Sequence, residues 1–151
     1  MFTYISLGTN DLPRAIRFYD PTLQALGHSR CDTSDESSWD GWVGWGHYEN
    51  HGQFELALWL CQPFNQQPAT VGNGTMIAFK AHSWHAVREF HAAAIQHGGS
   101  SEGAPGLRPQ YGDDFYAAYV RDPDGNKLAA ICRGFRHEDA DQTRLHATVQ
   151  S

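Results

Sequence analysis

The sequence carries the same pattern twice, 72 positions apart, and this internal repeat limits the folds available to the chain. Thr3–Leu7 aligns with Thr75–Phe79, and in both segments alternate apolar residues would share one face of a strand. Further matches at this offset are Leu12 with Trp84, Phe18 with Phe90, Leu23 with Ile95, Gly27 with Gly99 and Ser29 with Ser101. Each copy is therefore predicted to be a strand followed by a helix that ends at glycine. Two such halves can enclose a cavity.

The repeat sets the expected domain organisation. We expect a single domain over residues 1–133, with one module at 2–62, a linker at 62–73 and a second module at 74–133. A hydrophobic share of 40% in 151 residues is enough for one core. Residues 134–151 are polar and are predicted to form a mobile tail or a short surface helix.

Composition excludes several classes of partner. A formal net charge of −6 leaves no basic footprint for nucleic acid. No stretch reaches the roughly 18 apolar residues of a membrane span, and the first residues lack a secretory signal pattern. Cys31, Cys61 and Cys132 are odd in number and widely spaced, which favours a reducing cytoplasm. A cytoplasmic protein with a small neutral or cationic ligand, or a protein partner, is expected.

Hydrophobic periodicity places the remaining elements. Strands are predicted at about 2–8, 54–61, 74–80, 115–121 and 127–132. Asn10 or Asp11 should cap the first helix, which is expected to kink or restart at Pro21, and Ser83 should cap the second. Glycine and tryptophan alternate over 39–46, which indicates a loop leading into a strand. Asp122–Gly125 is typical of a tight turn.

Two of these segments resemble a known family. Gly8-Thr9-Asn10-Asp11-Leu12 leading to Phe18-Tyr19, together with Arg121-Asp122-Pro123-Asp124-Gly125-Asn126-Lys127-Leu128, resemble the vicinal oxygen chelate superfamily. This superfamily includes glyoxalase I, bleomycin-resistance proteins, fosfomycin-resistance enzymes and extradiol dioxygenases. The likeness covers about residues 2–133. It implies an α+β fold of two tandem βαβββ modules, whose glyoxalase-type mixed sheet curls around a shared cavity, commonly in a homodimer. Fold alone does not settle the chemistry.

The resemblance also locates the positions where metal-using relatives carry histidine or carboxylate ligands. They map to Tyr4, Glu55, Met76 and Ala129, and only Glu55 is a good ligand for a hard or borderline divalent ion. The histidines do not replace the missing ligands. His47 and His51 lie among glycines between strands, and those near the second helix are spread over different sides of it. The sequence therefore predicts neither a metal site nor another cofactor.

The alternation of side chains along the strands predicts which residues line the cavity in place of metal ligands. Tyr4, Trp59, Met76 and Tyr116 are predicted to contact the ligand, with Arg108 and Tyr111 on a loop over the cavity mouth. The register assumed for the second hairpin pairs Ala118 with Ala129 and Tyr116 with Ile131, and a slip of one residue would bring Phe115, Ala117 and Tyr119 to the cavity instead. Core packing is the alternative for the aromatic residues, and a solvated loop is the alternative for Arg108 and Tyr111.

Glu55 is the candidate catalytic residue. A carboxylate in a partly apolar cavity can serve as a general base, and a salt bridge to Lys80 or Arg108 is the alternative interpretation. The first functional hypothesis is a metal-free protein that binds a small molecule, like the drug-sequestering relatives. The second is a metal-independent acid–base enzyme of the same family that uses Glu55. A metal-dependent lactoylglutathione lyase or dioxygenase ranks third, because Tyr4, Met76 and Ala129 cannot replace the usual ligands.

Overall fold

The structure is a computed structural model that describes residues 1–134, so the predicted tail lies outside the described residues from position 135 onward. Two helices begin at side-chain caps. Asp11 accepts a hydrogen bond from the main-chain N–H of Arg14 to start α1 (Leu12–Gln24), and Ser83 accepts one from Ala86 to start α2 (Trp84–Gln96). The first and last residues of α2 lie 72 positions after those of α1, which is the offset of the repeat. α1 continues through Pro21, so the predicted restart there is wrong.

The strands form two separate mixed sheets, and the fold is α+β as predicted. The first sheet has the order β1-β3-β2, with β1 at Tyr4–Gly8, β2 at Trp42–Glu49 and β3 at Phe54–Cys61. The second has the order β4-β7-β6-β5, with β4 at Ile77–Lys80, β5 at Ser100–Leu107, β6 at Tyr116–Arg121 and β7 at Lys127–Cys132. In each sheet the strand before the helix pairs in parallel with the last strand of its unit, and the other pairs are antiparallel.

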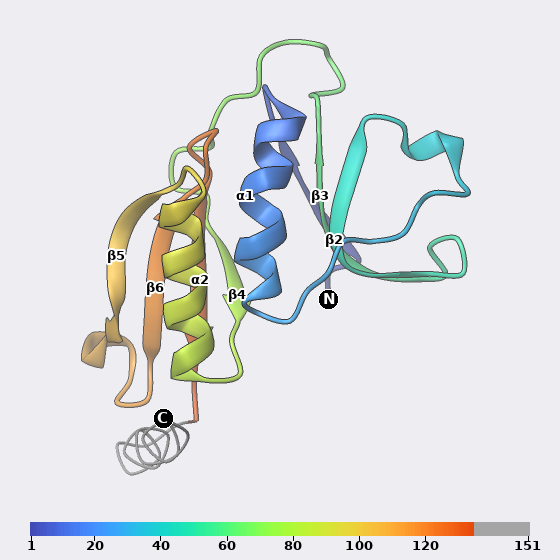
Figure 1. Cartoon of the computed structure of the whole chain (residues 1–151). Helices are drawn as coiled ribbons and strands as arrows, with labels where there is room; N and C mark the ends of the chain where they lie inside the picture. Colours follow the sequence, from blue (N-terminus) through green and yellow to red (C-terminus); the bar gives the residue numbers. More distant parts are fainter. Residues whose placement is uncertain (135–151) are drawn as a thin grey trace.

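The two units are related but unequal. The second is a complete βαβββ unit, whereas in the first the strand after the helix is reduced to a single bridge between Arg30 and Trp45. Two short 3₁₀ turns, Ser37–Trp39 and Pro109–Tyr111, lie in the connections. Figure 1 shows α1 and α2 side by side, with α2 lying across β5 and β6. No helix within residues 1–134 is long and apolar enough to cross a membrane.

The core lies between the helices and one face of each sheet. Phe18 of α1 and Phe90 of α2, which the repeat aligns, are both fully buried there. Alternate strand residues such as Leu58 and Leu128 point into the same core. The opposite face of each sheet is called the helix-free face below, because neither helix covers it. Any ligand site built on the sheets must use this face or the seam between the two units.

The register of the second hairpin differs by one residue from the prediction. Arg121 pairs with Lys127, so Tyr116 lies opposite Cys132 rather than opposite Ile131. The turn is longer because one carboxylate oxygen of Asp122 accepts the main-chain N–H groups of Asp124 and Asn126. Tyr116 and Ala118 consequently face the helices, whereas Phe115, Ala117 and Tyr119 take the other side, as the alternative register anticipates.

That hairpin turn joins the two units. Asp124 accepts hydrogen bonds from the hydroxyl of Thr9, the main-chain N–H of Asn10 and, at 2.9 Å, the guanidinium of Arg14. Its side chain is only 4% exposed. The contact therefore satisfies donors at the start of α1 with a carboxylate from the other half of the chain.

A second carboxylate of the turn completes this contact. The buried hydroxyl of Tyr19 donates to Asp122 Oδ2 at 2.7 Å. Burial, together with the nearby charges of Asp122 and Asp124, raises the pKa of Tyr19 well above its ordinary value. The phenol therefore remains a donor throughout the physiological pH range. The two segments that carry the family resemblance thus bind each other, and we call this contact the interunit latch.

We predict that Asp124→Ala lowers the free energy of unfolding by about 2–4 kcal/mol, because it leaves the buried Thr9 hydroxyl and the helix-start donors without their acceptor. Urea unfolding measured by circular dichroism would test this, with Asp35→Ala at an exposed loop position as the control. An equal, small change in both variants would show that the latch does not hold the units together.

Candidate functional site

Part of the helix-free face of the first sheet, around Trp59, is covered by its own chain. The indole ring of Trp39, from the 3₁₀ turn after residue 36, stacks on that of Trp59 with centroids 4.2 Å apart and planes 11° apart. Trp42 and Tyr48 meet Trp39 edge to face at 5.9 and 5.4 Å. Trp59 is only 1% exposed in this arrangement. Trp59, a predicted ligand residue, thus packs against Trp39.

Glycines in β2 make this packing possible. A Cβ atom at Gly44 would lie 2.3 Å from the ring of Trp59, so only glycine lets that ring lie across the strand. Gly46 has φ +127°, and a Cβ there would meet the main-chain oxygen of Leu56 at 2.4 Å. These glycines belong to strand β2, which begins at Trp42, inside the segment 39–46 that was predicted to be a loop leading into a strand. The alternation of glycine and tryptophan is thus a packing pattern of small and large residues.

Two carboxylates hold the aromatic cluster. Glu55 Oε1 accepts a 2.6 Å hydrogen bond from Trp59 Nε1. Glu36 accepts from the indole of Trp39 and the hydroxyl of Tyr48 and lies 3.0 Å from His51 Nδ1. Partial burial raises the pKa of Glu36, but these three hydrogen bonds outweigh it and lower the pKa below the usual value. Glu55 thus accepts a hydrogen bond from Trp59 of the same strand, and not from Lys80 or Arg108, the two partners considered for a salt bridge.

Strand pairing shows that the familial metal positions do not fit a divalent ion. Ile5 pairs with Leu58 and Ile77 with Leu128, so the residue of β3 that corresponds to Ala129 is Trp59, and Glu55 lies four positions earlier. This corrects the assignment of Glu55 to a ligand position. The four familial ligand positions are then Tyr4, Trp59, Met76 and Ala129, and none of these side chains is a usual ligand for a divalent ion. Within residues 1–134, no three histidine, cysteine or acidic side chains are grouped for metal binding.

The thiols are protonated rather than nucleophilic. Burial, with a smaller contribution from the Glu55 carboxylate, raises the pKa of Cys31 to about 11. Burial also raises the pKa of Cys61 and Cys132. All three are free cysteines, and their pKa shifts keep them as thiols at neutral pH.

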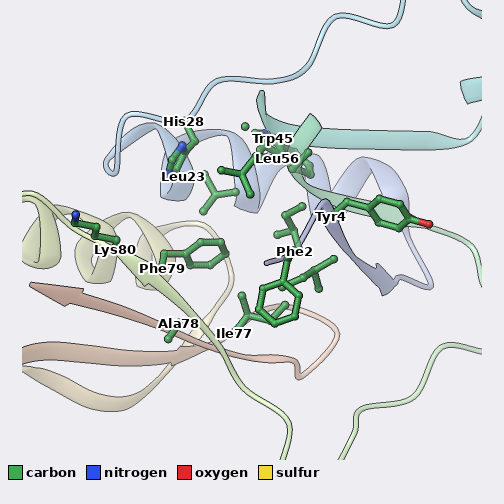
Figure 2. A pocket seen from close by; sticks show the side chains of 14 residues that line it. Phe2, Tyr4, Leu23, His28, Trp45, Leu56, Ile77, Ala78, Phe79 and Lys80 are labelled. Carbon is green, nitrogen blue, oxygen red and sulfur yellow. The ribbon is translucent and has the colours of Figure 1, made fainter. Parts of the chain in front are cut away.

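A pocket of about 290 Å³ lies at the seam between the two units. Figure 2 shows Phe2, Leu23, Ile77 and Phe79 converging on it, while the ring of Tyr4 points outward with its hydroxyl away from the pocket. The walls are mostly apolar, and His28 and Lys80 also line the pocket. Tyr4 is 55% exposed, so the structure places this predicted ligand residue at the rim.

A larger cavity, of about 600 Å³, lies on the helix-free face of the second sheet. It brings together three residues predicted to bind ligand: Met76, Arg108 and Tyr111. Its remaining lining residues are Glu102, Gly103, Gln110, Phe115, Tyr119, Lys127, Ile131 and Arg133. The combination of aromatic surface with a few charged groups is typical of a small-molecule site.

The other predicted residues lie elsewhere. Tyr116 faces the helices, and its ring stacks on that of Trp84 with centroids 4.3 Å apart. Tyr116 was assigned to the cavity because the assumed register was one residue out, whereas Tyr119 lies there as the alternative register predicted. Lys127 and Arg133 were missed. Lys127 begins the last strand and Arg133 directly follows it, so alternation from Ile131 would have placed both on the same face as Ile131.

Comparison with known proteins gives the family. Residues 2–130 match the model of the Glyoxalase/Bleomycin resistance protein/Dioxygenase superfamily. A glyoxalase/bleomycin resistance protein from Albidiferax ferrireducens is 35% identical, with a TM-score of 0.73 over 89% of this chain and 99% of that one. A search of curated proteins found no match.

More distant solved structures show the same fold. A hypothetical protein from S. aureus is 20% identical, with a TM-score of 0.62 over 87% of this chain and 92% of that one. A mutant of glyoxalase I from Zea mays is 22% identical, with a TM-score of 0.52 over 85% of this chain. The match covers 44% of the maize chain.

We predict that Trp39→Ala uncovers Trp59 and abolishes the coupled circular dichroism signal of the stacked indoles, because it removes the ring that lies 4.2 Å above Trp59. The loss of aromatic packing should cost about 1–3 kcal/mol of unfolding free energy. Phe64→Ala, at a fully exposed aromatic residue, is the control. An unchanged spectrum in Trp39→Ala would mean that residues 36–39 do not cover the sheet in solution.

Proposed function

Because the chain belongs to the Glyoxalase/Bleomycin resistance protein/Dioxygenase superfamily, we propose that it binds a small organic molecule, without a divalent metal, in the cavity on the helix-free face of its second sheet. The observation that carries this proposal is the cavity itself. Met76, Arg108 and Tyr111 meet there, and its volume suits a small organic ligand. On the corresponding face of the first sheet, Trp39 stacks on Trp59 and covers that ring.

The chemistry of the familial ligand positions supports metal independence. Ala129 has no donor atom and is fully buried, and Trp59 donates its only N–H to Glu55. A divalent ion needs at least three good donors, which these positions do not supply. The ligand should therefore be held by the aromatic, apolar and charged side chains of the cavity.

We also propose that the protein is a cytoplasmic homodimer. Phe2, Tyr4 and Leu56 are more than half exposed around the seam, and β1 and β4 are edge strands of their sheets. Exposed apolar side chains beside unpaired strand edges are a common basis of association between copies of a chain.

The proposed function predicts that small aromatic fragments bind to the protein after treatment with a chelator. Ligand-detected NMR would measure this binding. Ile131→Trp should reduce it at least about tenfold because the indole fills the cavity, whereas Ile95→Trp on the outside of α2 should leave it unchanged. Fragments that bind both variants equally, or only when divalent metal is added, would contradict the proposal.

The alternative is a metal-independent acid–base enzyme that uses Glu55. This carboxylate is half-buried on the first sheet, and it is absent from the lining of the cavity proposed here. For any fragment that the protein converts, an enzyme of that type should lose roughly 10²–10⁴-fold in turnover in Glu55→Gln. A binding protein should keep its fragment affinity within a few-fold in the same variant.

A further inference from the structure

Positive charge gathers in this cavity although the protein as a whole is acidic. Arg108, Lys127 and Arg133 line it, and Glu102 is its one carboxylate, so the walls carry an excess of two positive charges. Glu102 is itself engaged by Arg121, whose Nε lies 2.7 Å from Oε1. That hydrogen bond, with the charges of Arg121 and Lys127, lowers the pKa of Glu102, which therefore stays ionised and paired. The cation excess stands against a formal net charge of −6 for the chain.

Arg108 is held in place without a carboxylate partner within residues 1–134. Its guanidinium donates to the main-chain oxygens of Ala104 at 2.6 Å and Leu107 at 3.3 Å. Main-chain carbonyls orient a guanidinium but do not neutralise it. A half-buried, oriented and uncompensated guanidinium is suited to bind an oxyanion with little loss of side-chain entropy.

Strand β5 is shaped around this guanidinium. A Cβ atom at Gly103 would lie 3.3 Å from Arg108 Nη2, and one at Gly106 would lie 3.1 Å from Nη1. Two glycines thus give the arginine room to lie along the strand. The pairing of β5 with β6 is shifted at this point, on either side of Gly103. The glycines of the segment 103–108 therefore leave space for the side chain of Arg108.

Two of the cations lie close to the same aromatic ring. The guanidinium of Arg108 and the ammonium of Lys127 each lie 5.6 Å from the ring centroid of Tyr119. Arg133 lies 4.6 Å from the ring centroid of Phe115. Each cation gains a modest interaction with its ring, but the cations repel one another. A bound anion would relieve that repulsion.

We propose that this cavity binds an organic anion, with the oxyanion of a carboxylate or phosphate monoester held by Arg108 and Lys127 and an aromatic or apolar body packed on Phe115, Tyr111 and Ile131. This inference rests on the proposed function and names its ligand class. It replaces the neutral or cationic ligand expected from net charge, because charges a few ångströms away outweigh the diffuse charge of a screened surface.

The test uses the full-length protein and three matched probes. 2-Naphthoate, 2-naphthyl phosphate and the neutral 2-naphthamide are titrated while the backbone amide signals of Tyr119 and Ile131 are followed by NMR. The two anions should bind at least roughly tenfold more tightly than the amide, since a hydrogen bond to a charged group contributes about that much. Comparison of the two anions shows which oxyanion the cavity prefers.

Variants locate the charge responsible. Arg108→Gln should weaken anion binding by roughly 10- to 100-fold and change amide binding less than about twofold. Lys127→Gln is a second variant, outside the segment 103–108, and it should also weaken anion binding. Arg88→Gln removes an equal charge from an exposed position on α2 and should change neither affinity.

The outcomes separate the two proposals. If 2-naphthamide shifts the Tyr119 and Ile131 signals as strongly as the anions do, the anion site is wrong although the cavity still binds ligands. Equal anion affinity in wild type and both glutamine variants would also overturn it. If no probe moves these signals, and aromatic fragments bind equally well after Ile131→Trp, the proposed function fails together with this inference.

Discussion

The buried carboxylates of one hairpin turn determine how the two halves of this chain are arranged. Asp122 and Asp124 belong to the second unit, yet they accept hydrogen bonds from Tyr19, Thr9 and the main chain at the start of α1 in the first. Directed bonds to charged acceptors fix the relative placement of two elements, which apolar contact alone does not. The shared core and the seam pocket both depend on this placement.

The sequence predicts most of this fold because the repeat constrains two halves at once. The helix bounds follow from Asp11 and Ser83 and from a shared offset. The hairpin register was predicted one residue out because the Asp122 side chain draws Asn126 into the turn, a contact that no periodicity records. Because side chains alternate along a strand, a register error of one residue changes the face assigned to every residue of the strand. This is why Tyr116 was predicted for the cavity, and Tyr119 only in the alternative register.

Glycines influence what lies on the helix-free face of each sheet. On the first sheet, Gly44 admits the ring of Trp59, and Trp39 then covers it. On the second, Gly103 and Gly106 admit a charged side chain, and the face stays open. The site could be predicted only in part from the sequence, since Arg108 and Tyr111 were chosen as loop residues, without the cation grouping that only the folded sheet reveals.

Electron density in the cavity is the most direct test of the account. A crystal of protein purified without added metal should show an organic molecule between Arg108, Tyr119 and Ile131, with no anomalous signal from a transition metal beside Tyr4, Trp59 or Met76. A divalent ion coordinated at those three residues, with the second-sheet cavity occupied by water alone, would contradict it.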